Sequence, residues 1–417
     1  MFKEYSAWQW LLIDVANQYG LDKLNFEDRL QWAEENLDHL EDLGTGKHWK
    51  EEPLYYKAVA AVRRAQKGFP TGHVVGIDAV CSGMQIMSAL TGCKSGAAAT
   101  GMVDPNNRAD AYSQVTEEMS NILGVQQTVE RKKVKEAAMT VLYGAQKKPK
   151  EIFGEDTPEL NAFYRAMYNI APGACELLQV LLDSWRPFAP SHDWVLPDGF
   201  EAKVKVMKKI EKRIEVDELN HATFTYEYYE NEGRESGLSN AANLVHSCDS
   251  LVLRSLIRRC SYDAEEVQGA ANLLKEELFE RALATTEEVG ALPPNHPLNK
   301  YLVRYAASGF VDPVVIPHLD RESVKAMSRK MIRQLHNILV RMLEHKPFSV
   351  IPVHDQFGAH PNNINRVRYW YKEILAEIAE STVLEDLLSQ VYGKFIPVRK
   401  RDPHLAKDIR NSNYALC

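Results

Sequence analysis

The stretch GIDAVCSGMQ, residues 76–85, joins an apolar, strand-like run to a single acid, Asp78. Residues 73–77 before it are largely apolar, and Gly83 removes side-chain bulk five positions after it. A carboxylate at the end of a buried strand is costly unless a cation or a hydrogen-bond donor compensates its charge. The stretch therefore predicts a strand that delivers Asp78 to a site where positive charge binds.

A second stretch, VIPVHDQFG at residues 350–358, repeats this design, with an apolar run, then His354 and Asp355, then a predicted turn at Gly358. On neighbouring strands of one sheet, Asp78 and Asp355 could share divalent cations and so offset the cost of their burial. Mg²⁺ prefers carboxylate oxygens and substrate phosphates as ligands, and two such ions can serve an in-line displacement at phosphorus. Alone, a His-Asp dipeptide more often has a structural role.

A basic segment, RKKVKEAAMTVLYGA at residues 131–145, supplies a third feature. A four-residue spacing places four side chains on one stripe of a predicted helix over residues 129–143: Arg131, Lys135, Met139 and Tyr143. Cations on such a stripe can hold a triphosphate, with a flat aromatic ring at its end. Taken alone, this segment is better explained as a solvated basic helix, but the ordered combination of acid strand, basic helix and His-Asp strand is much rarer.

The spacing of apolar residues along the chain predicts an α+β protein that is predominantly helical. The chain has 417 residues, 45% hydrophobic and 26% charged, with a net charge of −7. Helical spacing covers most of it, including single helices over 26–43 and 158–184 and two long helices within 262–340, and strand-like runs are few. We therefore expect a small sheet surrounded by helices. No apolar run is long enough for a membrane span. The six cysteines are widely spaced, which is typical of reduced thiols in a cytoplasmic protein.

The three stretches resemble motifs A, B and C of the single-subunit RNA polymerases of the phage and mitochondrial type. The resemblance implies a right-hand palm built on a small antiparallel sheet, with helical fingers. It also implies two Mg²⁺ ions held by Asp78, Asp355 and the carbonyl of Ala79, where the family has Gly. The implied catalytic residues are Asp78, Lys135, Tyr143 and Asp355.

Further matches extend the resemblance along the chain. They are LDKLNFEDRLQWAEEN (21–36), DAYSQV (110–115), NLVHSCDS (243–250) and DIRNSNYALC (408–417), the last similar to the family's carboxy-terminal foot near the active site. The nucleotide-binding residues implied are Lys23, Tyr112, Arg131, Lys135, Tyr143 and His246. The residues implied for the template and ribose pocket are Ser82, Gly83 and Gly144.

A related class, the A-type DNA polymerases, is the first alternative. Those enzymes carry a bulky Glu five residues after the motif A acid, where this chain has Gly83, and a Glu after the His-Asp pair, where it has Gln356. We therefore expect empty space beside Gly83 for a ribose 2′-hydroxyl, within reach of Tyr143 and His246. A site built around a hydroxyl rejects the analogue that lacks it. A non-catalytic polymerase fold that only binds DNA is the second alternative.

The domain organisation follows from the same resemblance. We expect palm in 1–125, fingers in 126–236, a palm–fingers return in 237–261, a helical insertion in 262–340, and palm with the foot in 341–417. The family's N-terminal domain, thumb and D-x-x-G-R stretch have no counterpart. Met1 and the foot favour a complete product, similar to the large subunit of a heterodimeric phage RNA polymerase acting in the host cytoplasm. A second subunit would then supply the missing parts, and the isolated chain would be inactive.

Segment 214–236 lies where promoter-reading members carry a specificity hairpin. It is rich in acids and tyrosines: Glu215, Asp217, Glu218, Glu227, Glu230, Glu232, Tyr226, Tyr228 and Tyr229. Base edges in duplex DNA are read mainly by Arg, Lys, Asn and Gln, whereas tyrosines stack on unpaired bases. We therefore expect weak recognition of a duplex promoter, with a single-stranded template or a recruiting factor in its place. The expected partners are thus DNA, RNA, ribonucleoside triphosphates and a second subunit, and no membrane.

Overall fold

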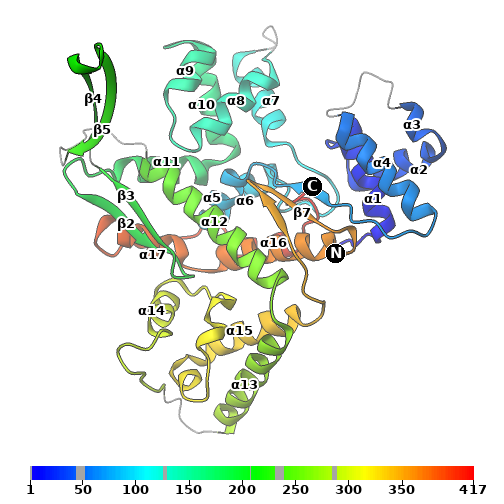
Figure 1. Cartoon of the computed structure of the whole chain (residues 1–417), viewed down its shortest axis with the longest axis vertical. Coiled ribbons are helices and arrows are strands. Elements are labelled where there is room, and N and C mark those ends of the chain that lie inside the picture. Colours follow the sequence, from blue (N-terminus) through cyan, green and yellow to red (C-terminus); the bar gives the residue numbers. More distant parts are fainter. Residues whose placement is uncertain (1, 44–51, 125–128, 207, 231–238, 284–288) are drawn as a thin grey trace.

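Helices make up most of the described chain and surround three small antiparallel sheets (Figure 1). The structure, a computed structural model, describes residues 2–43, 52–124, 129–206, 208–230, 239–283 and 289–417. The predicted class, α+β and predominantly helical, is confirmed. Among these residues, no helix combines the length and the apolar character that crossing a membrane requires. The six cysteines are free thiols, as expected: Cys81, Cys93, Cys175, Cys248, Cys260 and Cys417.

The central sheet has the strand order β1-β7-β6 and is antiparallel throughout. Its strands are β1 (Val75–Asp78), β6 (Ile351–Val353) and β7 (Gln356–Ala359). The register pairs Asp78 with Gln356 and Ile77 with Phe357. Ile77 and Phe357 are buried, so their face of the sheet packs on the core.

The turn predicted at Gly358 was wrong. Gly358 lies inside β7. The chain reverses earlier, at His354 and Asp355, where His354 takes a left-handed conformation with φ 57°. A Cβ on Gly358 would come within 2.9 Å of the Val74 side chain, so glycine serves close packing in the sheet here. The earlier reversal places Asp355 in the β6–β7 turn, directly beside the end of β1.

Three long helices pack behind this sheet and carry much of the core: α5 (Ser82–Thr91), α12 (Ser239–Cys260) and α16 (Ile364–Glu380). Helix α16 buries Trp370, Tyr371 and Leu375 in one continuous apolar cluster. Helices α17 (Val383–Tyr392) and α18 (Leu405–Asn411) complete the C-terminal part. The sheet end and the first turn of α5 are therefore fixed by the main hydrophobic core.

The N-terminal helices form their own apolar cluster, shown in blue in Figure 1. The elements are α1 (Ala7–Ala16), η1 (Asn17–Leu21), α2 (Phe26–Glu35), η2 (Leu37–His39), α3 (Leu40–Leu43) and α4 (Glu52–Gln66). The single helix expected over 26–43 is interrupted at Asn36, where the backbone leaves helical geometry. Leu12, Tyr55 and Val62 are buried between these helices.

The region expected to form the fingers is helical. Its helices are α6 (Lys94–Ala99), α7 (Ala111–Leu123), α8 (Arg131–Val141), α9 (Lys147–Phe153), α10 (Pro158–Ile170) and α11 (Pro172–Asp183). The helix expected over 158–184 divides at Ala171, because Pro172 disfavours helical geometry in the residue before it and starts a new helix. Helix α8 ends at Val141, so Tyr143 lies in the turn beyond it and the predicted helical stripe stops at Met139.

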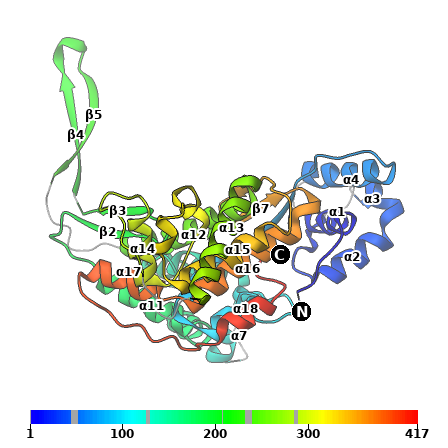
Figure 2. The same ribbon diagram turned by 90° about the horizontal axis from the view of Figure 1, so that it is seen from below.

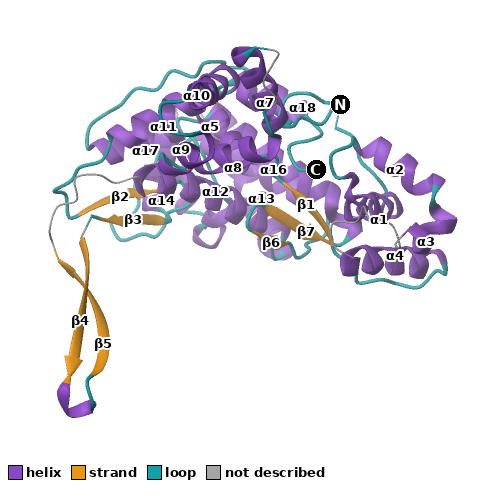
Figure 3. Ribbon diagram, turned by 90° about the horizontal axis from the view of Figure 1, so that it is seen from above, coloured by secondary structure: helices purple, strands orange, loops and turns teal. Residues whose placement is uncertain are grey.

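Two hairpins follow α11. Strands β2 (Ser191–Val195) and β3 (Glu201–Lys205) form the first, and β4 (Lys208–Val216) and β5 (Ala222–Glu230), linked by η3 (Asp217–Leu219), form the second. Figures 2 and 3 show the β4–β5 hairpin standing away from the rest of the molecule. The acid-rich segment expected over 214–236 is described only as far as Glu230, so Glu232 lies outside the described residues.

The expected insertion, 262–340, is helical but more divided than the two long helices predicted. It contains α13 (Ala264–Leu283), α14 (Asn299–Ser308), η4 (Pro313–His318), η5 (Ser323–Ala326) and α15 (Arg329–Met342). A final short turn, η6 (Pro361–Asn363), precedes α16. Helices α13 and α15 pack on each other, and the group lies at the lower end of the view in Figure 1.

Candidate active site

The backbones of the two predicted metal-binding acids lie side by side. The Ala79 N–H donates a hydrogen bond of 3.0 Å to the Asp355 carbonyl oxygen, and Asp78 pairs with Gln356 next to it. The expected burial of both carboxylates was wrong, since the Asp78 side chain is exposed and that of Asp355 half-buried. Both acids lie at the same end of the sheet, because Asp78 is the last residue of β1 and Asp355 lies in the turn between β6 and β7.

The end of the chain packs against the same strand end. The Cys417 N–H donates to the Asp78 carbonyl at 2.9 Å, and the Asp78 N–H donates back to the Cys417 carbonyl at 3.3 Å. The residues just before this end are also held in place. Buried Arg368 and Lys372 on α16 donate hydrogen bonds to the backbone carbonyls of Asn413 and Ser412, respectively. The expectation that residues 408–417 lie near Asp78 is thereby confirmed.

Tyr143 lies directly against Gly83. A Cβ built on Gly83 would come within 2.9 Å of the Tyr143 hydroxyl oxygen, and the neighbouring Ser82 side chain acts to lower the Tyr143 pKa. The empty space expected beside Gly83 is therefore occupied by the phenol of Tyr143. The cause is the early end of α8, since Gly144 adopts φ 89° and the resulting turn directs Tyr143 toward α5.

The Tyr143 ring also stacks on His246. Their ring centroids are 4.5 Å apart and their planes differ by 7°, and His246 stands exposed on α12. Burial raises the pKa of Tyr143 to about 12, and the charges of Asp249 and Asp355 add to the rise. The phenol is thus a neutral hydrogen-bonding group at neutral pH, held between Gly83 on one side and His246 on another.

The cations of α8 gather around Tyr112. The Arg131 guanidinium carbon and the Lys135 Nζ lie 5.7 Å and 5.8 Å from the Tyr112 ring centroid. Arg131 also forms an ion pair of 2.6 Å with Asp110, the residue that caps the N-terminus of α7. Burial acts to raise the pKa of Asp110, but hydrogen bonds from Arg131 and Ser113 bring it below its ordinary value.

Tyr112 and Cys81 connect these cations to the acids. The Tyr112 side chain lies within electrostatic reach of the Cys81 thiol, and burial together with that thiol raises the Tyr112 pKa. Burial also raises the pKa of Cys81, to which the charge of Asp355 adds and which that of Lys135 opposes. Asp355 and Lys135 therefore both lie within electrostatic reach of Cys81, which places acids and cations around one centre.

A third acid, Asp249, belongs to this centre, and the sequence analysis did not assign it a role. Burial, together with the negative charge of Asp355, raises the pKa of Asp249 from 3.8 to about 6. Asp249 follows His246 by three residues on α12, so both side chains project from the same helix face. That spacing, within the motif already noted at 243–250, is the signal that could have identified it.

Lys23 is the predicted nucleotide-binding residue that the structure does not bring into this group. Its ammonium is exposed and pairs with Asp22 at 2.8 Å. Within the described residues, the ion pairs and ring contacts of Lys23 do not include Tyr112, Arg131 or His246. Its predicted contact with phosphate stays a prediction.

The donor set at the sheet edge suits Mg²⁺. Asp78 and Asp355 offer hard carboxylate oxygens from adjacent chain segments, and the charge of Asp355 adds to the burial that raises the pKa of Asp249. A divalent cation between the acids would relieve that charge. Ala79 follows Asp78 at the same edge.

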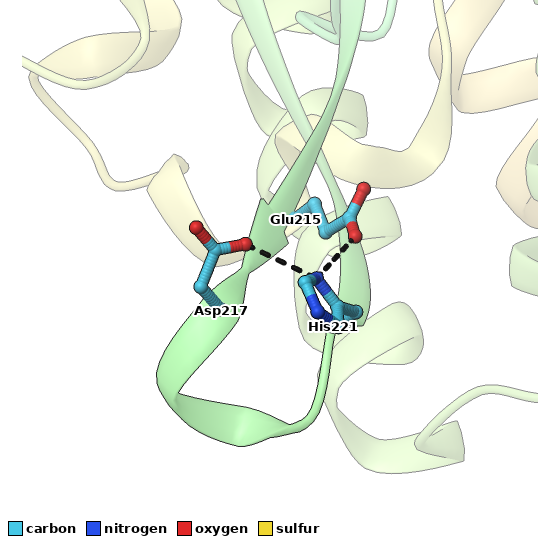
Figure 4. A group of neighbouring side chains, drawn as sticks. All are labelled: Glu215, Asp217 and His221. Carbon is cyan, nitrogen blue, oxygen red and sulfur yellow. Dashed lines mark ion pairs between the residues drawn. The ribbon is translucent and has the colours of Figure 1, made fainter.

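A different cluster stands at the far end of the β4–β5 hairpin. Over the described part of the chain, only Glu215, Asp217 and His221 bring three ligand atoms of the metal-binding type within 4.8 Å of one another (Figure 4). The His221 Nδ1 lies 2.8 Å from Glu215 and 3.2 Å from Asp217. All three are exposed, and their mutual ion pairs account for the arrangement.

Comparison with known proteins gives one consistent relationship. Residues 3–150 match the family model described as DNA-dependent RNA polymerase. A probable DNA-directed RNA polymerase of Neurospora crassa is 32% identical over 154 residues, which is 32% of this chain and 17% of that protein. The DNA-directed RNA polymerase of Pseudomonas phage phiKMV is 34% identical over 121 residues, 25% of this chain and 15% of that protein.

A mitochondrial DNA-directed RNA polymerase of Arabidopsis thaliana is 29% identical over 172 residues, 33% of this chain and 18% of that protein. The matched stretch thus spans less than a fifth of the length of each of these relatives. It includes Asp78 and α8, whereas Asp355 and His246 lie beyond the residues that the family model matches.

Proposed function

Residues 3–150 of this chain are related to the DNA-directed RNA polymerases of the phage and mitochondrial type, and we propose that the chain is the catalytic part of such an enzyme. It would transfer nucleotidyl groups from ribonucleoside triphosphates to a growing RNA on a DNA template. One observation carries the proposal. Asp355, from outside the related stretch, lies beside Asp78 from inside it, as a shared metal site requires.

The acids would bind the metal. Asp78 and Asp355, with the carbonyl of Ala79, would hold two Mg²⁺ ions, and the ions would supply activation of the RNA 3′-hydroxyl and stabilisation of the leaving pyrophosphate. The backbone contacts of Asp78 with Cys417 hold its strand end in place. Asp249, whose pKa burial raises to about 6, would keep the negative charge of the site adjustable.

The cations would bind the triphosphate. Arg131 and Lys135 flank Tyr112, and Lys23 would add a further charge. A phosphate oxygen must compete with Asp110 for Arg131, because the two side chains already form an ion pair. We propose that Lys135 meets the triphosphate first and Arg131 exchanges partners.

The stacked pair of Tyr143 and His246 would select the sugar. Their rings lie against each other beside Ser82 and Gly83, and Gly144 gives the turn that positions the tyrosine. A ribose 2′-hydroxyl could hydrogen-bond the neutral phenol or the imidazole. Because glycine at position 83 is what makes room for Tyr143, the bulky acid of the A-type DNA polymerases does not fit here.

Thumb and N-terminal functions would come from a second polypeptide. The proposed palm combines the central sheet with α5, α12 and α16, and the proposed fingers comprise α7 to α11. A thumb supplied in this way would add contacts with phosphates, which provide much of the affinity for nucleic acid. The host cytoplasm, where a phage enzyme would act, belongs to the same proposal.

Nucleotide addition tests this function directly. The chain, together with any polypeptide that co-purifies with it from its native source, is given an RNA primer annealed to a DNA template, Mg²⁺ and one matching nucleotide. We expect ribonucleotide addition in preference to deoxyribonucleotide addition, and a loss of at least about a hundredfold in Asp355→Asn. Glu218→Gln, at the far end of the β4–β5 hairpin, is the control. Addition that is undiminished in Asp355→Asn, or a preference for deoxyribonucleotides, would refute the proposal.

A further inference from the structure

The β4–β5 hairpin has two faces of different chemistry. Paired residues point to the same side of a two-stranded ribbon, and successive pairs alternate between its sides. One side, the aromatic face, carries Ile210, Lys212, Ile214, Val216, Ala222, Phe224, Tyr226 and Tyr228, and Glu230 follows on the same side at the base of the hairpin. The other side, the acidic face, carries Lys209, Glu211, Arg213, Glu215, Thr223, Thr225 and Glu227.

Side-chain contacts confirm this division. On the aromatic face, the rings of Tyr226 and Tyr228 stack with centroids 5.8 Å apart and planes 19° apart, and the Lys212 Nζ lies 5.4 Å from the Tyr228 centroid. On the acidic face, Lys209 pairs with Glu227 at 2.7 Å and with Glu211 at 3.2 Å. The charged network and the ring stack therefore occupy opposite sides of the hairpin.

The aromatic face is open to solvent. Ile214, Phe224 and Tyr226 expose 45%, 48% and 44% of their surface, and the hairpin projects away from the rest of the molecule (Figure 2). A continuous exposed apolar surface usually marks an interaction site. The described side chains of this face include one cation, Lys212, and one acid, Glu230 at the base of the hairpin.

This chemistry fits an unpaired nucleic-acid strand. Bases stack on aromatic side chains without regard to sequence, and a nearby cation attracts the phosphates. A duplex fits poorly, because a ribbon in the major groove lies between two phosphate backbones. Glu211, Glu215 and Glu227 on the acidic face would then oppose one backbone, with Asp217 and Glu218 at the tip adding to the repulsion.

We propose that the aromatic face of the β4–β5 hairpin binds single-stranded DNA, with bases stacked on Tyr226 and Tyr228 and Lys212 beside the phosphates. This inference rests on the proposed function, in which an unpaired strand lies next to the enzyme during transcription. Of the acids expected to repel DNA, Glu215 and Glu227 lie on the side away from Tyr226 and Tyr228.

Equilibrium binding of the full-length chain tests the proposal. The probes are a fluorescently labelled oligothymidylate of about a dozen nucleotides and a blunt duplex of the same length. Tyr226→Ala and Tyr228→Ala should each weaken single-strand binding by roughly five- to a hundredfold, the range typical of losing one stacked base. Thr225→Ala, the neighbouring position on the acidic face, should bind like the wild-type chain.

Photochemical crosslinking distinguishes DNA bound at the aromatic face from DNA bound at basic segments elsewhere in the chain. An oligonucleotide carrying 5-iododeoxyuridine should crosslink to the peptide with Tyr226 and Tyr228, and the crosslink should disappear when both are replaced by alanine. Equal binding by the tyrosine variants, or crosslinks only elsewhere, would overturn the proposal. Capture of a second polypeptide through this face with no single-strand binding would overturn it as well.

The polymerase function and the single-strand binding surface can be tested separately. Asp355→Asn should keep single-strand binding and its crosslink while losing nucleotide addition. If the wild-type chain binds the oligonucleotide through Tyr226 but adds no nucleotide with its co-purified partner, the polymerase function fails and the surface stands. If nucleotide addition occurs but the tyrosine variants bind normally, the surface assignment fails and the function stands.

Discussion

The Tyr143 ring lies flat against the His246 imidazole, with centroids 4.5 Å apart and an interplanar angle of 7°. One ring comes from the turn after α8 and the other from α12, so the contact joins two segments about a hundred residues apart in the chain. Both rings would meet the sugar of a bound nucleotide, so each should depend on the other. Their coupling can be measured.

A double-mutant cycle on Tyr143→Leu and His246→Ala should show this dependence. We expect each change to raise the KM for a ribonucleotide, and the double variant to lose less than the sum of the two. The shortfall should be about 0.5–1.5 kcal/mol, the usual worth of an aromatic pair. Strict additivity in single-nucleotide addition would show that the two rings act separately.

Gly83→Ala should disturb the same site from the other side. The added Cβ would lie 2.9 Å from the Tyr143 hydroxyl, so the phenol must move. We expect weaker discrimination between ribo- and deoxyribonucleotides and a loss of about 1–3 kcal/mol in stability, as for other overpacked sites.

Gly269→Ala is the matched control for this change. Gly269 is also helical, on α13, but it has open space around it, so alanine there should leave discrimination unchanged and slightly raise the melting temperature. Normal discrimination in Gly83→Ala would mean that the position of the Tyr143 hydroxyl does not matter for sugar selection.

Sequence reasoning located the acids because the pattern of apolar strand followed by Asp is local. The positions of Asp78 and Asp355 on adjoining segments follow once β1 and β7 pair, and pairing of the two apolar runs was the natural expectation. The burial of the acids could not be predicted in the same way, since it depends on which strand end faces solvent.

Other predictions were wrong or incomplete because they depend on where helices end and on how strands pair. Tyr143 was placed on a helical stripe, although Gly144 immediately after it signals a helix end. The role of Asp249 appears only in the folded chain, where its carboxylate lies within electrostatic reach of Asp355. The sequence alone does not show on which side of the β4–β5 hairpin each acid lies. Only the strand register places Glu227 and Tyr226 on opposite sides.

Asp110→Asn should strengthen nucleotide binding. Asp110 holds Arg131 in an ion pair and also caps α7 through the N–H groups of Tyr112 and Ser113. Asparagine is as good an N-cap as aspartate, so the variant should keep helix stability while releasing Arg131 for phosphate. We expect a several-fold lower KM for the nucleotide with an unchanged melting temperature.

Asp110→Ala is the comparison variant for the cap. It also frees Arg131, but it removes the capping hydrogen bonds and should lower stability by about 0.5–2 kcal/mol. An increased KM in Asp110→Asn would show that Asp110 orients Arg131 toward the nucleotide instead of competing for it.

Asp249 should make stability fall as pH rises from about 4 to 6. Burial raises its pKa from 3.8 to about 6 in the folded chain, with the charge of Asp355 adding to the shift. Between those values the folded chain keeps a proton that the unfolded chain has released, so proton loss favours unfolding. The stabilising contribution is therefore complete below pH 3.8 and is lost as pH passes 6.

Asp249→Asn removes this ionisation and should be more stable than the wild-type chain at pH 7.5 by on the order of 1–3 kcal/mol. The difference should disappear near pH 4, and thermal melts across this range measure it. Glu218→Gln, an exposed acid at the tip of the β4–β5 hairpin, should change stability by less than about 0.5 kcal/mol at either pH.

The same melts also report on the metal site. Part of the shift at Asp249 comes from the charge of Asp355, and Mg²⁺ bound by Asp355 would offset that charge. Millimolar Mg²⁺ should therefore reduce the stability difference between Asp249→Asn and the wild-type chain at pH 7.5, and it should not do so in an Asp355→Asn background. A difference that ignores Mg²⁺ would count against a metal ion at Asp355, independently of any assay of RNA synthesis.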